Sequence, residues 1–276
     1  MQHEDETRAT QPVVTTEPRE GVTTLTLSRP LQLNAVNAEM IAHLRHALQS
    51  AEQDSTCRAV VITGSGRGFC AGLDLDGYGT APGPLGEGPV HLGLAIQRDV
   101  SSIVQQLHRM SKPVVAAING PTAGFGLALA CAADIRIASR LATFTTAFVR
   151  IGVTGCDLGV SWLLPRLIGA GRAHELILTA RSVDATEANE IGLVADAVDP
   201  ELLTQRVDQT LDDLLRAAPL ALDLTKQGMW LALGASSLEQ AIELENRQQI
   251  LIAQTADRTE GLAAFRERRE PTYHGR

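Results

Sequence analysis

The sequence predicts an α/β fold whose C-terminal part is mainly helical. Valine- and isoleucine-rich runs at 59–63 and 113–118 each lead into a glycine-rich turn and then a helix, which is the pattern of buried strands alternating with helices. From about residue 158 the pattern becomes mainly helical. A chain of 276 residues can bury a sizeable core in one large unit with an appended segment. Alternation followed by helices is typical of an α/β unit with a helical extension.

The first sixty residues are expected to hold a hairpin and a helix. Residues 1–11 are polar and acidic and are expected to be disordered. The β-rich runs 13–16 and 22–27 flank the segment Glu-Pro-Arg-Glu-Gly, which predicts a hairpin. The segment 34–37, Asn-Ala-Val-Asn, is predicted to cap a helix that continues to about residue 53. Its predicted apolar face consists of Met40, Ile41, Leu44, Ala47 and Leu48.

The rest of the chain alternates further before the helices take over. Residues 77–93, rich in glycine and proline, are expected to form a loop, either a lid over a ligand or an excursion without order. Asp184, three residues before Glu187, predicts a capping-box-like helix start. The other predicted elements are helices at 96–110, 126–133, 204–215, 237–254 and 256–268, and strands at 113–118, 134–138 and 142–145.

Composition excludes several classes of partner. The net charge of −8 argues against nucleic acid and anionic membranes, because both require a basic face. The most apolar stretch, 113–138, is interrupted by Asn119, Asp134 and Arg136, so it is predicted to be core and not a membrane span. The N-terminus has no apolar signal segment, which favours the cytoplasm. Without CxxC spacing or histidine partners, the cysteines are read as reduced thiols and no metal is expected: Cys57, Cys70, Cys131 and Cys156.

Two segments of similar design are the candidates for chemistry. Residues 60–75 and 114–139 each read as a buried strand, a glycine-rich turn and a helix. Glycines allow sharp turns and close approach of a ligand, and they leave N–H groups free at a helix N-terminus. Two such turns side by side can point two N–H groups at one carbonyl oxygen. Either turn alone is also compatible with an ordinary strand–helix connection. Neither shows a dinucleotide or P-loop phosphate fingerprint in the required context.

The motifs within these segments carry a family resemblance. FCAGLD at 69–74, NG at 119–120, AGFG at 123–126 and ADI at 133–135 resemble the signature of the enoyl-CoA hydratase/isomerase (crotonase) superfamily. The early RP at 29–30 with LNA at 33–35, LLPR at 163–166 and the late FRER at 265–268 fit the same pattern. The resemblance is collinear over about residues 13–272, so it covers nearly the whole chain.

The resemblance implies a fold, a substrate class and an assembly. The fold would be the ClpP/crotonase-like spiral of ββα units, with a core at 12–200 and a C-terminal helical oligomerisation segment at 201–276. The chain would act on acyl-CoA thioesters in fatty-acid or related metabolism, as a homotrimer or a hexamer. Coenzyme A arrives as part of the substrate, so no separate cofactor is implied. The backbone N–H groups of Leu73 and Phe125 would form an oxyanion hole for the thioester oxygen.

The resemblance also assigns residues to coenzyme A. The stretch around Leu33, Ala35 and Ala71 would line the adenine and pantetheine. Phe265 and Arg268 occupy positions of C-terminal contacts that sometimes reach a neighbouring subunit, with arginine in place of the usual lysine. A solvated helix face is the alternative for Arg268. Asp74 is expected to cap its turn. The full predicted set is Leu33, Ala35, Ala71, Leu73, Asp74, Phe265 and Arg268.

The sequence departs from the family where its hydratases carry two glutamates. Those positions read Ala128 and Phe148, which cannot transfer a proton. Asp157, in GCDLG before LLPR, resembles the catalytic aspartate of dienoyl-CoA and epoxyphenylacetyl-CoA isomerases. Burial near Phe148 and Trp162 is expected to raise its pKa and make it a better base. An N-cap for a helix starting near residue 158 is the alternative.

Double-bond isomerisation is therefore favoured over hydration, since an allylic shift needs only one acid/base group. A hydrolase or dehalogenase using Asp157 is a second possibility. A non-catalytic acyl-CoA-binding protein is the third, because both glutamate positions are non-acidic.

Overall fold

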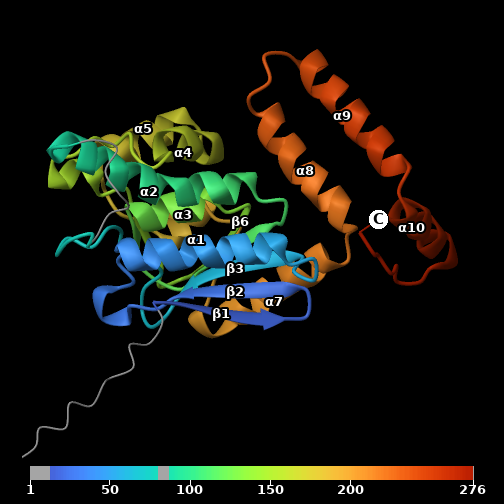
Figure 1. Cartoon of the computed structure of the whole chain (residues 1–276), viewed down its shortest axis with the longest axis horizontal. Helices are drawn as coiled ribbons and strands as arrows, with labels where there is room; N and C mark the ends of the chain where they lie inside the picture. The colour runs from blue at the N-terminus through green and yellow to red at the C-terminus, as the bar shows by residue number, and fades with distance from the viewer. Residues whose placement is uncertain (1–12, 80–86, 276) are drawn as a thin grey trace, which may run out of the picture.

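The computed structural model describes residues 13–79 and 87–275. The predicted tail at 1–11 and the middle of the predicted loop at 77–93 lie outside these residues. The described chain forms a mixed sheet with helices on both faces and a group of C-terminal helices beside it (Figure 1). The predicted α/β class with a helical C-terminal part is confirmed. None of the described helices is long and apolar enough to cross a bilayer.

The main sheet has six strands in the order β1-β2-β3-β4-β6-β9. The predicted hairpin is confirmed, because the first two strands pair antiparallel around a turn at Gly21. All other neighbours are parallel, so each connection must cross over, mostly through a helix. The strands are β1 (Val14–Arg19), β2 (Val22–Leu27), β3 (Ala59–Gly64), β4 (Val114–Ile118), β6 (Ile135–Ser139) and β9 (Asp196–Val198).

Alternating side chains of the parallel strands enter two different cores. Val60 and Ile62 of β3 join the main core under the crossover helices. Ala59 and Val61 point the other way, into a smaller cluster with the helix after β9. Strands buried on both faces read as continuous apolar runs, which is why β3 and β4 were easy to predict. The covering helices are α1 (Ala38–Gln53), α2 (Pro89–Arg109) and α3 (Phe125–Ala132) on the first face and α7 (Leu203–Leu215) on the second.

A second, three-stranded sheet has the order β5-β7-β8. The chain leaves β4, turns at Gly120 and Pro121, and enters this sheet before starting α3. The successive segments β4-β5 and β6-β7 therefore each contribute one strand to each sheet. The remaining elements are β5 (Thr122–Ala123), β7 (Thr143–Thr145), β8 (Val183–Asp184), the 3₁₀ turns η1 (Pro30–Gln32), η2 (Phe148–Ile151) and η3 (Pro200–Leu202), and the helices α4 (Val160–Ile168), α5 (Ala170–Thr179) and α6 (Ala185–Glu190).

Two predicted helix starts are confirmed and one is wrong. The side chain of Asn37 accepts a hydrogen bond from the Met40 amide at 3.0 Å, and that of Asp184 accepts one from the Glu187 amide at 2.8 Å. Helix α2 begins at Pro89, seven residues before the predicted start at 96. Proline is favourable at the first helical position because its missing N–H would be unpaired there anyway. The last part of the predicted loop is thus helical.

A buried lysine contributes to the attachment of the C-terminal helices to the body, beside the packing of Trp230 on the main core. Lys226 of α8 is only 3% exposed. Its ammonium group pairs with Asp134 Oδ2 at 2.8 Å and donates to the carbonyl oxygens of Leu107 at 3.1 Å and Lys112 at 2.9 Å. In Figure 1 the last two helices extend away from the sheet, whereas α7 packs on it. The helices are α8 (Pro219–Ala232), α9 (Leu238–Ala253) and α10 (Ala256–Glu267).

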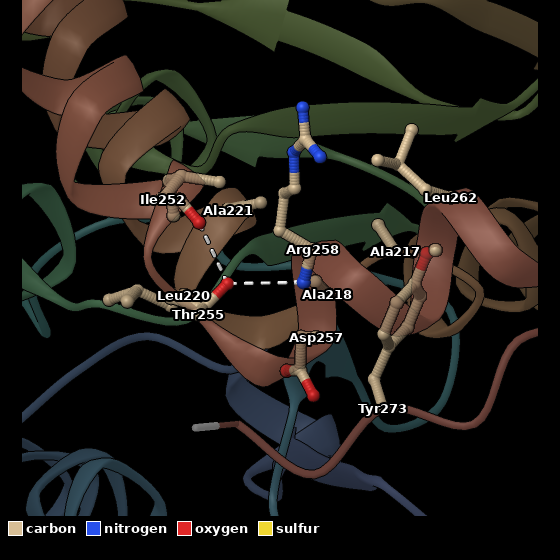
Figure 2. Close-up of a pocket in the computed structure, with 11 residues that line it drawn as sticks. Ala217, Ala218, Leu220, Ala221, Ile252, Thr255, Asp257, Arg258, Leu262 and Tyr273 are labelled. Atoms are coloured by element: carbon tan, nitrogen blue, oxygen red, sulfur yellow. Dashed lines mark hydrogen bonds between the residues drawn. The ribbon is translucent and has the colours of Figure 1, made fainter.

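The cavity in Figure 2 belongs to this C-terminal group. It has a volume of about 340 Å³ and is lined by residues of α8, α9, α10 and the tail. Thr255, which caps α10, donates to the Ile252 carbonyl at 2.8 Å and accepts from the Arg258 amide at 3.1 Å. None of the residues that line it belongs to either glycine-rich turn.

Candidate active site

The two glycine-rich turns interlock through their backbones. The Ala123 amide donates to the Cys70 carbonyl at 2.9 Å, and the Cys70 amide donates to the Pro121 carbonyl at 3.2 Å. Close packing explains the glycine at the start of α3, since a Cβ on Gly126 would lie 2.1 Å from the Cys70 carbonyl oxygen. Gly72 has a φ of +109°, and its Cβ position lies 3.3 Å from the Ala123 carbonyl oxygen. The turns thus form a single backbone unit.

Each turn presents a backbone amide with no acceptor among the described residues. Phe125 is the first residue of α3, and amides at that position have no partner within the helix. Leu73 forms an isolated parallel bridge with Val36 in which the Val36 amide donates to the Gly72 carbonyl and the Asp74 amide donates to the Val36 carbonyl. The N–H of Leu73 therefore points away from Val36. Two unpaired amides on touching turns are compatible with the predicted oxyanion hole, whose donors must point at one oxygen.

The residues predicted around coenzyme A surround the first turn. The Ala71 amide donates to the Leu33 carbonyl at 3.0 Å, and Ala35 is buried next to the bridge at Val36. The buried side chain of Asn34 fastens this segment by donating to the Gly68 carbonyl at 2.8 Å. The structure thus brings Leu33, Ala35 and Ala71 together with Leu73. Sequence reasoning had not assigned this structural role to Asn34.

Asp74 fixes the turn that follows Leu73. Its carboxylate accepts a hydrogen bond from the Asp76 amide at 3.1 Å, which confirms the predicted cap. It also pairs with Arg29 at 2.7 Å. The hydrogen bond from Arg29 holds the pKa of Asp74 below its usual value. A carboxylate that stays ionised in an ion pair is a structural anchor and a poor proton acceptor.

Asp157 lies between η2 and α4 and is half-buried. Its Oδ1 accepts a hydrogen bond from the Leu158 amide at 2.7 Å and another from the side-chain amide of Gln97 on α2. Burial raises the pKa of Asp157, as predicted, although both hydrogen bonds act in the opposite direction. The N-cap alternative is wrong, because α4 begins at Val160 with Gly159 as its cap. Trp162 packs against His108 and Trp230 at ring distances of 5.7 and 5.8 Å.

Gln97 is the residue of this site that sequence reasoning missed. It lies three residues before Val100 and seven before Val104, both of which are buried on the inner face of α2. A polar residue at core spacing was the available signal. A predicted helix start at 96 places Gln97 in the first turn. Too few residues then precede it to show that it lies on the inner face of the helix.

Comparison with known proteins decides the family. The family described as Enoyl-CoA hydratase/isomerase matches residues 17–276. The chain is 39% identical over 257 residues to the 1,2-epoxyphenylacetyl-CoA isomerase of Escherichia coli (strain K12), which covers 93% of this chain and 96% of the relative. The chain belongs to the enoyl-CoA hydratase/isomerase family.

Other relatives in the family carry different names. A probable enoyl-CoA hydratase of Mycobacterium tuberculosis (strain ATCC 25618 / H37Rv) is 37% identical over 262 residues, covering 95% of this chain and 92% of that protein. The crystal structure of a probable enoyl-CoA hydratase/isomerase from Mycobacterium abscessus superposes with a TM-score of 0.90 at 35% identity, covering 96% of this chain and all of that one. The predicted crotonase fold is confirmed.

The two positions predicted to replace the glutamates of hydratases are both apolar and buried. Ala128 is fully buried in α3. Phe148 opens η2, and its ring edge lies 3.7 Å from the position of a Cβ on Gly124. An apolar wall therefore flanks the Phe125 turn where the family's hydratases are expected to carry glutamates.

Two predicted contacts are not brought to the site within one chain. Phe265 lies on α10 and is 84% exposed, and Arg268 is the exposed C-cap of that helix with a φ of +54°. In Figure 1, α10 is well separated from α2 and α3. Their contact with coenzyme A stays a prediction that requires a neighbouring subunit.

Proposed function

We propose that this enzyme shifts the double bond of an enoyl-CoA thioester, with Asp157 as its acid/base group. The observation that carries the proposal is the half-buried carboxylate of Asp157, a base whose pKa burial raises, in a site whose two glutamate positions are Ala128 and Phe148. A raised pKa brings a carboxylate closer to the proton affinity that general base catalysis needs at neutral pH. The similarity to a named CoA-thioester isomerase supports the same reaction class.

The proposed reaction is a 1,3-proton transfer. Asp157 removes a proton from C2 of a 3-enoyl thioester, and the electron pair of the broken C–H bond moves into the thioester as an enolate. The amides of Leu73 and Phe125 hydrogen-bond to the enolate oxygen, and one such donor is typically worth about 3 kcal/mol of barrier. The protonated Asp157 exchanges its proton with solvent and then donates a proton to C4 of the enolate, which leaves the double bond between C2 and C3. Atoms and electrons balance without a cofactor.

The surroundings of this reaction are proposed from the same family. Leu33, Ala35 and Ala71 would contact coenzyme A alongside the first turn. Phe265 and Arg268 would reach the coenzyme A of a neighbouring protomer in a homotrimer or hexamer. The exposed apolar side chains of the C-terminal helices, such as Leu238, Ile250 and Leu251, support a role of this segment in assembly. A cytoplasmic location is proposed on the sequence composition.

The test uses isotopic labelling. Wild-type enzyme and Asp157→Asn are each incubated with 3-hexenoyl-CoA or 2-hexenoyl-CoA in deuterated water, and products are followed by mass spectrometry. Isomerisation with deuterium uptake and without added water is expected for wild type. Asp157→Asn should isomerise about 10² to 10⁴ times more slowly while acyl-CoA still binds. Isomerisation by Asp157→Asn as fast as by wild type, or addition of water to 2-hexenoyl-CoA by the wild-type enzyme, would contradict the proposal.

A non-catalytic acyl-CoA-binding protein is the second candidate, because two apolar residues replace the expected acids. The same experiment separates the two. Retained binding with no deuterium uptake from any enoyl-CoA would favour the binding protein, and release of free coenzyme A would favour a hydrolase.

A further inference from the structure

The carboxylate of Asp157 is held asymmetrically. Both hydrogen bonds that it accepts, from the Leu158 amide and from the Gln97 side chain, go to Oδ1. Oδ2 accepts no hydrogen bond among residues 13–79 and 87–275. A carboxylate oxygen that already accepts two donors is the weaker base, since hydrogen bonding to the charged form stabilises it. The two oxygens of Asp157 are therefore chemically distinct.

Gln97 can hold this position because its helix is fixed. Asp99, two residues further along α2, accepts a hydrogen bond from the Tyr78 hydroxyl at 2.5 Å and pairs with Arg45 of α1. The Ala38 amide at the start of α1 donates to the Tyr78 carbonyl at 2.7 Å. The N-terminal half of α2 is thus tied to α1 and to the chain just after Leu73 and Asp74. Gln97 extends from that anchored part of the helix.

The other end of the contact is also tightly packed. The Cβ position on Gly159, two residues after Asp157, lies 3.6 Å from Val104 Cγ1 of α2. The Val160 amide donates to the Asp157 carbonyl at 2.8 Å. Helix α2 therefore contacts this segment at two points, through Gln97 at the Asp157 carboxylate and through Val104 at Gly159.

Arginine side chains on the elements around Asp157 form no ion pair with it among the described residues. Arg98 of α2 and Arg150 of η2 are exposed, and Arg166 of α4 lies over the Trp162 ring at 3.8 Å. None of these pairs with Asp157 within the described part of the chain. The influences on the pKa of Asp157 are burial, the Leu158 amide and the Gln97 side chain.

We infer that Gln97 is the positioning residue of Asp157: it fixes Oδ1 and leaves Oδ2 as the atom that takes up and returns the proton. This inference rests on the proposed isomerase function. Without the Gln97 amide only the Leu158 amide holds Oδ1, so the carboxylate is fixed less firmly and can rotate more freely. Oδ2 then approaches the C–H bond of the substrate less often in the reactive geometry. A misplacement of about 1 Å can lower the rate about a hundredfold.

The test compares two glutamines on the same helix. Gln97→Met removes the donor to Asp157, and Gln106→Met removes a donor at 3.2 Å to the Arg45 carbonyl, which is remote from the carboxylate. The readout is the pH profile of kcat for isomerisation of 3-hexenoyl-CoA. For Gln97→Met we expect kcat to fall about ten- to a hundredfold with little change in KM. The acidic limb should move to higher pH, because a donor that favours the ionised form is lost. Gln106→Met should keep the wild-type profile.

A second variant guards against a folding defect. Gln97→Glu keeps the side-chain shape but places a second carboxyl group beside Asp157, so its acidic limb should move at least as far toward higher pH. Circular dichroism and melting verify that each variant is folded. If both variants keep the wild-type kcat and acidic limb, Gln97 has no positioning role. If Asp157→Asn itself isomerises at the wild-type rate, the proposed function fails first, and the two failures are thereby distinguished.

Discussion

The two halves of the candidate site, the paired glycine turns and the acid at Asp157, are held in place by different kinds of contact. The paired turns are held by backbone hydrogen bonds and by glycines that let the other turn approach closely, as at Gly126 against Cys70. The acid half is held by side chains, because Asp157 is positioned by Gln97 from a helix sixty residues earlier. Backbone contacts of this kind depend on a glycine pattern, whereas the acid half depends on two particular side chains. The first half can therefore serve a whole family, and the second can differ between its members.

The largest effect is expected from breaking the backbone half. Gly126→Ala places a Cβ 2.1 Å from the Cys70 carbonyl oxygen, so the two turns must separate. We expect kcat/KM to fall at least about a hundredfold, as for loss of an oxyanion-hole donor, together with a marked loss of melting temperature. Gly171→Ala, where no atom lies within 4 Å, is the matched control and should be neutral or slightly stabilising. A Gly126→Ala enzyme with normal activity would show that the turns are not a rigid unit.

The second-largest effect is expected for helix α8, which is also held by side chains, and it concerns the stability of the fold. Lys226→Met leaves Asp134, whose Oδ1 already lacks a partner among the described residues, without its buried cation. Breaking a buried pair in this way typically costs about 3–5 kcal/mol, which urea unfolding would measure. The double variant Lys226→Met with Asp134→Asn should recover part of the loss, because no uncompensated charge remains. Equal stabilities of the single and double variants would argue against the ion pair as the attachment.

The pH dependence of stability tests the acid half without assaying activity. Since burial raises the folded-state pKa of Asp157, its stabilising contribution is complete below the unfolded value and is lost as pH rises through the folded value. Asp157→Asn should therefore melt at a higher temperature than wild type at neutral pH. The difference should shrink as the pH approaches the unfolded pKa of about 3.8. An Asp157→Asn variant that is less stable at neutral pH would show that this carboxylate is structural.

The smallest effect is expected from Asp74, the carboxylate beside the Leu73 turn. The folded-state pKa of Asp74 is lowered by Arg29, so its contribution is present above the unfolded value and is lost as pH falls through the folded value. Asp74→Asn should lower the melting temperature at neutral pH by about 2 °C, the change that follows from about 1 kcal/mol or less in a chain of this size. Its isomerisation rate should stay within a few-fold of wild type, in contrast to Asp157→Asn. A rate loss as large as that of Asp157→Asn would remove the distinction between the two acids.

The local parts of this protein could be predicted from its amino-acid sequence. The strands around Val60 and Val114, the hairpin, the cap at Asn37 and the face of α1 were all predicted, because apolar periodicity and capping side chains act within a few residues. The glycine motifs located both turns, and the family resemblance predicted roles for the amides of Leu73 and Phe125 and for the acid at Asp157.

How those parts meet became known from the folded structure alone. It placed Gln97 on Asp157, showed that Gly159 and not Asp157 caps α4, and attached α8 through Lys226 and Asp134. It also left Phe265 and Arg268 far from the turns within one chain. The physical reason is common to all of these. Each depends on a contact between side chains or elements that are distant in sequence, and neither periodicity nor local spacing encodes which of them the packed core will bring together.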